Sequence, residues 1–198
     1  ALDPQIAPWA LPKELGGTGY EEAVKLAKGW LAEAGYPDGK GLPPITLMYN
    51  TSEGHKKIAE AVTAMWKEAL GIDVQVENME WAVYLNTISK NTPLADMPHI
   101  WRQGWCADYA DQNNWVKEVF SPKARNDIRW GNEEFQKLVD EAEVAPDPAK
   151  RKELYFQAEK ILNDDVAAII PIYYYTTVAL TKPWLTRFYG EMGGEHFW

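Results

Sequence analysis

The chain is poor in the residues that covalent and metal chemistry require. It has 198 residues, with one cysteine, Cys106, and three histidines. A single cysteine cannot form an internal disulfide, and it excludes a zinc site built from several cysteines. The histidines lack the i, i+4 spacing of helical metal ligands, so we expect neither a metal nor a cofactor. Because the histidines fall at a helix start, a strand start and the tail, we predict that Cys106 is a buried structural residue and not a nucleophile.

Positive charge, long apolar runs and catalytic motifs are scarce as well. The net charge is −9 and no segment is rich in lysine or arginine, which makes nucleic acid and anionic lipid unfavourable partners. No apolar run approaches the ~20 residues that a membrane-spanning helix needs. The G-x-S-x-G, P-loop, G-x-G-x-x-G and H-E-x-x-H patterns are missing. The sequence therefore gives no support for the common hydrolase, nucleotide-binding or metalloprotease chemistries.

What the sequence does contain is an alternation of strand and helix patterns. Such an order implies βαβ units, so we predict an α/β fold with a largely parallel or mixed sheet flanked by helices. Trp30 and Trp66 lie on apolar helix faces and are expected in the core. Strands are predicted at residues 43–50, 72–79, 97–105 and 167–180. Helices are predicted from a capping box at Thr18 and Glu21 to Gly35, over 55–70, over roughly 82–89, and after the caps Asn132 and Asp147.

Residues 101–115, WRQGWCADYADQNNW, combine an arginine with aspartates and tryptophans. They begin within the strand predicted at 97–105 and run past its carboxyl end, where ligands of α/β sheets sit. Charges at such a place are costly unless they reach water, each other or a ligand. Arg102 and Asp108 could therefore hold the carboxylate and the ammonium of a zwitterion such as a peptide. A private salt bridge between the two is the structural alternative.

Other interpretations of this segment stay open. Asp108 and Asp111 form a carboxylate pair of the kind that a glycoside hydrolase uses, although a turn or helix-capping role for Asp111 is favoured. Trp101 and Trp105 could equally line a pocket or pack in the core. The ten tryptophans and ten tyrosines exceed what a core of this size requires, which indicates a recognition surface.

Several segments follow one another in a specific order and spacing between Tyr20 and Trp184. They are LAEAGYPDGKGLPPITLMYN, IAEAVTAMWKEALGIDVQVENMEW, GWCADYADQNNW, NEEFQKLVDEA with RKELYFQAEKIL, and IIPIYYYTTVALTKPW. In this order they resemble the C-terminal lobe of the peptide-type solute-binding proteins of bacterial ABC importers, the oligopeptide, dipeptide and nickel-binding class called family 5. The resemblance implies a binding protein and not an enzyme, with two lobes that close on a ligand about a hinge.

The resemblance also implies an organisation. Residues 1–19 are an extended lead-in, residues 20–184 are the C-terminal ligand-binding lobe, and residues 185–198 are a tail leading back toward the other lobe. The chain begins with Ala1 and has no signal-peptide pattern, so we expect a piece of a longer protein with its export signal upstream. Such proteins are monomers that serve a membrane permease from the periplasm, or from the outer face of the cytoplasmic membrane as lipoproteins.

Roles for individual residues come from the same resemblance. Asp108 stands where oligopeptide-binding members place the aspartate that pairs with the peptide amino terminus. Arg102 stands where some members offer a cation to the peptide carboxylate. Trp105 and Tyr109 occupy the flanking pocket positions, and Tyr175 matches a ring that can line the side-chain pockets.

The chain departs from the family pattern at Gln112, where proline is common, and this loosens the prediction for the loop. Peptide binding is the expected function. An oligosaccharide ligand is an alternative suggested by the aromatic content, since flat rings pack on sugar faces. A glycoside hydrolase that uses Asp108 and Asp111 is the alternative from another class.

Overall fold

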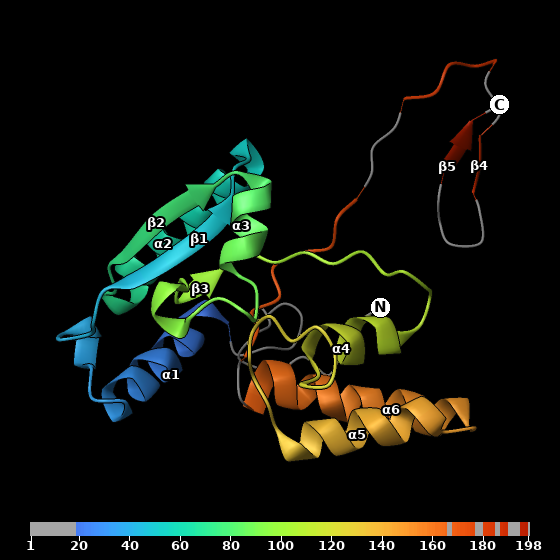
Figure 1. Ribbon diagram of the computed structural model, residues 1–198. Coiled ribbons are helices and arrows are strands. Elements are labelled where there is room, and N and C mark those ends of the chain that lie inside the picture. Colours follow the sequence, from blue (N-terminus) through green and yellow to red (C-terminus); the bar gives the residue numbers. More distant parts are fainter. Residues whose placement is uncertain (1–18, 166–167, 177–179, 185–186, 190–194, 198) are drawn as a thin grey trace. The chain divides into compact units, whose positions relative to one another are not determined.

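A computed structural model describes residues 19–165, 168–176, 180–184, 187–189 and 195–197. The chain divides into two compact units, residues 1–104 and 105–198 (Figure 1). The lead-in predicted for residues 1–19 lies, except for its last residue, outside the described ranges. No helix in the described ranges is both long and apolar enough to cross a membrane.

The first unit is built on a parallel sheet with the strand order β2-β1-β3. The strands are β1 (Ile45–Asn50), β2 (Val74–Met79) and β3 (Ile100–Trp101). The register places Ile45 beside Val74. Parallel strands joined through helices are what the alternating sequence pattern predicts. The third strand is shorter than predicted, because only two residues of the range 97–105 join the ladder.

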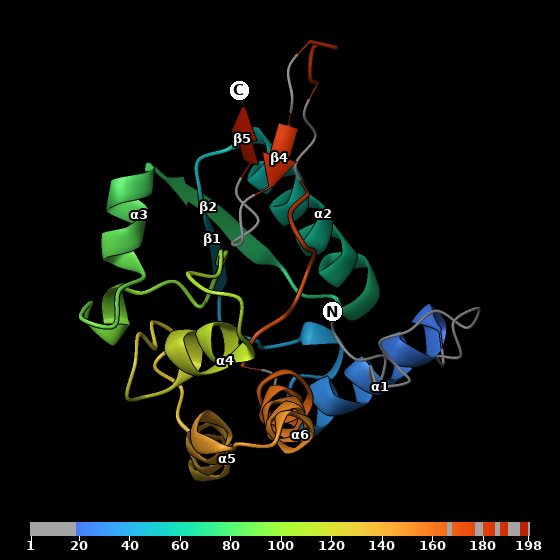
Figure 2. The same ribbon diagram turned by 90° about the vertical axis from the view of Figure 1, so that its right-hand side faces the viewer.

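Helices cover both faces of β1, as Figure 2 shows for α2 (Glu53–Leu70) and α3 (Trp81–Thr87). Three successive residues of β1 are buried, which fits a strand enclosed on two sides. The α2 face buries Leu47, Tyr49 and Ala59, and the α3 face buries Met48, Tyr84 and Ile88. Short 3₁₀ turns lie at Pro37–Gly39 and Leu94–Asp96.

Glycines end the first two helices, as predicted. After α1 (Tyr20–Glu33), Gly35 adopts a φ of 92° and the Tyr36 N–H bonds to the Leu31 carbonyl at 2.9 Å. This is the Schellman arrangement, which satisfies carbonyls that the helix leaves open. Gly71 ends α2 with a φ of 73°.

Two predictions for α1 are wrong. Gly19, and not Thr18, occupies the capping position and makes no side-chain cap, while Thr18 itself lies outside the described residues. Trp30 is 51% exposed and does not lie in the core. None of the residues of α1 is buried. Trp66 does pack against the core residues of the α2 face, as predicted.

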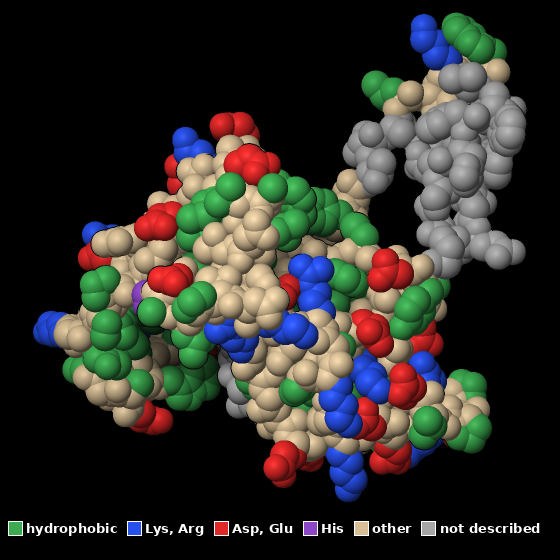
Figure 3. Space-filling model, in the orientation of Figure 1, with side chains coloured by type: hydrophobic (Ala, Val, Ile, Leu, Met, Phe, Trp, Pro, Cys, Tyr) green, Lys and Arg blue, Asp and Glu red, His purple; other side chains and the backbone are tan. Residues whose placement is uncertain are grey.

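The second unit is a cluster of helices: α4 (Gln112–Phe120), α5 (Glu133–Val144) and α6 (Pro148–Lys160). A π-helical turn, Ile161–Asp165, continues α6. Acidic and basic side chains are interspersed over the outer surface of this unit (Figure 3). The core residues are Val116, Phe135, Val139, Ala142, Leu154, Tyr155, Ala158, Ile161 and Leu162.

The caps predicted for α5 and α6 are confirmed. The Asn132 side chain accepts a hydrogen bond from the Phe135 N–H at 2.9 Å, and the Asp147 side chain accepts one from the Ala149 N–H at 3.0 Å. Each cap satisfies an N–H that has no partner inside the helix. No range was predicted for helix α4, although its apolar residues recur at helical spacing and a turn or helix-capping role was expected for Asp111.

The strand predicted at residues 167–180 is wrong for the part that is described. Residues 168–176 form no strand, and residues 170–176 are exposed. β-branched and aromatic residues favour a strand only where a neighbouring strand completes the ladder, and no described segment pairs with this one. The other sheet among the described residues is a hairpin of β4 (Arg187–Tyr189) and β5 (Glu195–Phe197).

Candidate ligand-binding site

The segment Trp105–Asp111 is irregular and leads into α4. Asp111 ends it as the N-cap, with Oδ1 accepting a hydrogen bond from the Asn113 N–H at 2.8 Å. Gln112 then takes the first helical position, where proline is favoured because that N–H needs no partner. The capping role predicted for Asp111 is confirmed, and the helix begins here without the proline.

Asn114 fixes the middle of this segment. It is 1% exposed, and its Oδ1 accepts hydrogen bonds from the Trp105 Nε1–H at 2.8 Å and from the Asp108 backbone N–H at 3.0 Å. Its Nδ2 donates to the Asp108 carboxylate, with 3.2 Å between Nδ2 and Oδ2. One buried amide therefore orients an indole and a carboxylate together. Asp108 itself is exposed, so its charge faces solvent.

Tyr109 is fixed through a second asparagine. Asn113 Nδ2 donates to the Tyr109 hydroxyl at 2.8 Å, and Asn113 Oδ1 accepts from the Tyr155 hydroxyl at 2.8 Å. Tyr155 belongs to α6 and is fully buried, which raises the pKa of Tyr155 to about 12. Tyr109 is 40% exposed, so its ring remains accessible while its hydroxyl is anchored.

A salt bridge ties the end of the segment to α6. Arg151 Nη2 lies 2.7 Å from Asp111 Oδ1, and Arg151 Nη1 donates to the carbonyls of Ala142 and Glu143. Partial burial acts to raise the pKa of Asp111, but the hydrogen bonds from Arg151 and Asn113 outweigh it and lower that pKa. A glycosidase acid needs a raised pKa. Asp111 is thus unsuited to be the acid of such a pair, and its Oδ1 serves as a structural anchor for the Asn113 N–H and for Arg151.

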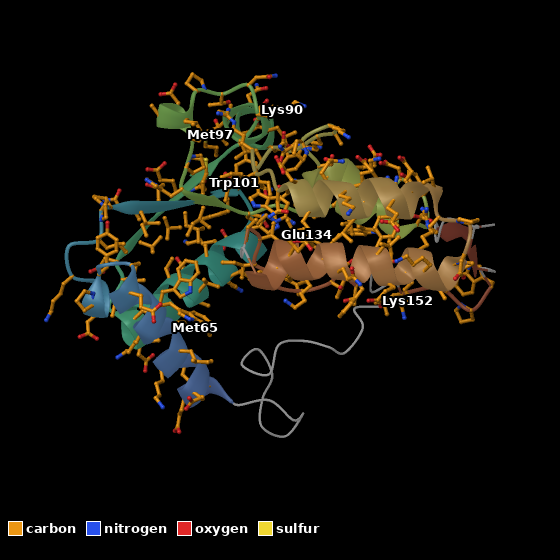
Figure 4. All side chains as sticks on the ribbon, turned by 90° about the horizontal axis from the view of Figure 1, so that it is seen from below. Met65, Lys90, Met97, Trp101, Glu134 and Lys152 are labelled. Carbon is orange, nitrogen blue, oxygen red and sulfur yellow. The ribbon has the colours of Figure 1, made fainter. Side chains whose placement is uncertain are left out.

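The two tryptophans that the sequence left open differ in their surroundings. Trp101, labelled in Figure 4, ends β3 and packs against the buried residues Met48 and Tyr84. Trp105 is only partly buried, and the Cζ of Arg125 lies 5.3 Å from the centroid of its ring. That distance is typical of a cation–π contact. Trp101 is therefore a core residue of the first unit, whereas Trp105 belongs to the exposed segment.

Arg102 lies in the first unit, directly after β3. Its N–H donates to the Met48 carbonyl at 2.9 Å, and its own carbonyl accepts from the Tyr84 hydroxyl. Burial raises the pKa of Tyr84, and the charge of Arg102 partly opposes this. The guanidinium lies next to Gly104, where an added Cβ would stand 2.6 Å from Arg102 Nη2. The other predicted site residues belong to the second unit.

Tyr175 lies outside the strand predicted for it, and Cys106 is not buried. Tyr175 is 60% exposed and lies outside any strand, with its ring centroid 4.9 Å from that of Tyr173. Cys106 is exposed, so the prediction of a buried cysteine is wrong. In this irregular segment Trp105 and Asp108 make the hydrogen bonds to the buried Asn114, whereas Cys106 lies on the surface.

Sequence reasoning missed the residues that support the segment. The apolar spacing of Val116, Val119 and Phe120 after the cap Asp111 could have revealed α4, and with it the asparagines in its first turn. No local signal points to the α6 partners, which are 40 residues or more away along the chain. The supporting residues are Asn113, Asn114, Arg125, Arg151 and Tyr155.

The chain matches known proteins along most of its length. The model of the bacterial extracellular solute-binding proteins, family 5 Middle, matches residues 2–127. The periplasmic oligopeptide-binding protein OppA of Salmonella typhimurium is 37% identical over 190 residues, which cover 96% of this chain and 32% of that protein.

Solved structures agree. The Escherichia coli murein tripeptide binding protein MppA superposes with a TM-score of 0.76 at 35% identity, over 89% of this chain and 33% of that one. Haemophilus influenzae OppA in complex with RPPGFSPFR gives a TM-score of 0.67 at 35% identity, over 84% of this chain and 31% of that one. The chain spans about a third of the length of these relatives. The resemblance inferred from the sequence is confirmed, and the chain belongs to family 5 of the bacterial extracellular solute-binding proteins.

Proposed function

We propose that residues 20–184 are the C-terminal lobe of a two-lobe protein that binds peptides for a bacterial ABC importer. The relatives named above are oligopeptide- and murein tripeptide-binding proteins, and one of them was solved with a peptide. The protein then works in the periplasm, or anchored on the outer face of the cytoplasmic membrane. It passes its ligand to the permease of the importer, and residues 185–198 lead back toward the other lobe.

The observation that carries this proposal is the state of Asp108. Its carboxylate is exposed, yet Asn114 holds both its Oδ2 and its backbone N–H. A charged acceptor that is oriented before binding loses little entropy when it meets a cation. A peptide amino terminus supplies such a cation and can form charge-assisted hydrogen bonds with the carboxylate.

The other site residues have complementary roles in the proposal. Trp105 and Tyr109 serve as walls of the site, since each ring is anchored at its polar end and partly open to solvent. Arg102 offers a cation to the peptide carboxylate, and Tyr175 lines a side-chain pocket. Peptides of varied sequence are accepted because recognition rests on main-chain groups and end charges.

Calorimetry on the intact two-lobe protein tests the role of Asp108. Di- to pentapeptides are titrated with free and with acetylated amino termini. Acetylation and Asp108→Asn should each cost about 3–5 kcal/mol, as expected for removing one partner of a desolvated charge pair. Glu141→Gln removes one exposed charge from α5 in the same unit and serves as the matched control. Unchanged affinity after acetylation contradicts the assignment.

A sugar ligand is the second candidate, favoured by the aromatic rings on the surface of the second unit. Tyr109, Trp115 and Tyr173 are between 40% and 50% exposed. Flat rings of this kind stack on sugar faces as readily as they pack on peptides. Thermal shift measurements with peptides and oligosaccharides separate the two, because only a true ligand raises the melting temperature with its concentration.

A further inference from the structure

We infer that Arg125 is a second charged contact of this site and that it selects ligands with a carboxylate close to their ammonium group. The inference rests on the proposed function, because it takes Asp108 as the ammonium site. It follows from the contacts that the Arg125 guanidinium makes with Trp105 and Asp127.

The guanidinium of Arg125 is fixed on its face and on one edge. Its Cζ lies 5.3 Å from the centroid of the Trp105 ring, and its Nε donates to the Asp127 carboxylate. The Asp127 side chain is 10% exposed, whereas the Arg125 side chain is 40% exposed. Asp127 takes the Nε edge, and the two terminal nitrogens form the fork that binds a carboxylate in bidentate geometry.

The loop that carries Arg125 is attached to the end of α4. The Arg125 N–H donates to the Glu118 carbonyl at 3.1 Å, and the Asn126 N–H donates to the Val119 carbonyl at 3.0 Å. Asn126 adopts a left-handed φ of 44°, which asparagine tolerates better than most residues. The Arg125 side chain therefore starts from a fixed backbone, so that binding orders few additional bonds.

Arg125 and Asp108 share one support within the second unit. Trp105 contacts Arg125 with its ring and donates its Nε1–H to Asn114, which in turn holds the Asp108 carboxylate. One indole and one amide separate the cation from the anion. A ligand that carries both charges on a single residue matches this arrangement. An N-terminal glutamate or aspartate is such a residue, and the main-chain carboxylate of a very short ligand offers the same chemistry.

Binding of matched peptides to the intact two-lobe protein tests the inference. The first pair is Glu-Ala-Ala and Gln-Ala-Ala, both with amidated carboxyl ends, so that only the side chain carries a carboxylate. The second pair is Ala-Ala with a free and with an amidated carboxyl end. We expect about tenfold tighter binding of the carboxylate form in at least one pair, since a hydrogen bond to a charged group contributes about 1.5–3 kcal/mol.

Arg125→Gln should abolish the preference in the pair that shows it and leave the affinity for the peptides without a carboxylate within about twofold. Arg125→Lys keeps the charge, loses the fork and should keep only part of the preference. Lys123→Gln removes a positive charge from the same loop, where Lys123 pairs with Asp140, and should leave the preference intact. Melting temperatures establish that each variant is folded.

The pair that responds to Arg125→Gln identifies the source of the carboxylate, and either response supports the inference. Equal binding within both pairs, or Arg125→Gln reducing the preference in neither pair, overturns the inference while peptide binding stands. If the wild-type protein binds none of these peptides, the proposed function fails and the inference with it.

Discussion

Replacing Asn114 by alanine is expected to destabilise the second unit and to weaken ligand binding at the same time. The change removes the acceptor of the Trp105 and Asp108 N–H groups and the donor to the Asp108 carboxylate. Each net hydrogen bond contributes about 0.5–1.5 kcal/mol. Three such bonds at a residue that is 1% exposed predict a loss of roughly 2–4 kcal/mol in the free energy of unfolding.

Urea denaturation of the full chain, followed by tryptophan fluorescence, measures this loss. For a chain of this length the melting temperature should fall by roughly 4–16 °C. Gln112→Ala changes an exposed amide at the start of the same helix and should stay within about 0.5 kcal/mol of wild type. A free energy of unfolding for Asn114→Ala that matches this control would refute the anchoring role.

Asn114→Asp separates the acceptor role from the donor role. The substituted side chain keeps its acceptor oxygens but places a second carboxylate beside Asp108. Like charges raise the pKa of a carboxyl above its unfolded value, so this variant should be least stable at neutral pH. Its stability should recover as the pH falls through the raised pKa, because protonation removes the repulsion. A constant stability difference from wild type across this pH range contradicts the contact.

Four further changes test other parts of the fold. Tyr155→Phe should lower the free energy of unfolding, measured with urea, by about 1–3 kcal/mol. The change removes the hydroxyl that donates to the buried Asn113 Oδ1, which then loses this partner. The hydrogen bond from Lys123 lowers the pKa of Asp140 to about 2. The Asp140 carboxylate therefore stabilises the fold at pH values above the pKa of an unfolded aspartate, and this stabilisation is lost as the pH falls from about 4 toward 2. The urea midpoints of wild type and Asp140→Asn should therefore converge over this range. Gly71→Ala should destabilise by at least about 1–2 kcal/mol, since Gly71 has a φ of 73° and an added Cβ would stand 2.5 Å from the Asp38 carbonyl oxygen. Gly29→Ala, within α1 and with no atom within 4 Å of the added Cβ, should instead stabilise by about 0.5–1 kcal/mol in the same assay.

Features set by a few neighbouring residues could be predicted from the sequence. Asn132 and Asp147 cap their helices because a short polar side chain reaches the N–H groups of the next turn. Gly35 and Gly71 end theirs because a left-handed φ favours glycine. The parallel sheet follows from strands separated by helices. These signals are local, so the rest of the chain does not alter them.

Features that depend on distant partners could not be predicted. The residue types at 167–180 favour a strand, but residues 168–176 pair with no strand in the part of the chain that the structure describes. At the candidate site, Asp108 was found from its motif. The residues that orient the segment around Asp108 come from α4 and α6. Nothing in the spacing along the chain reveals that Tyr155 bonds to Asn113 or that Arg151 bonds to Asp111.

The cross-links between the Trp105–Asp111 segment and the helices affect how this segment moves. An irregular surface segment usually exchanges its amide protons through small local openings that cost little free energy. Here Asn113 joins it to the buried Tyr155, and Asp111 joins it to Arg151. Opening the whole segment therefore also breaks bonds to α4 and α6, so hydrogen exchange at the Asp108 amide should be slower than in a surface segment without such links.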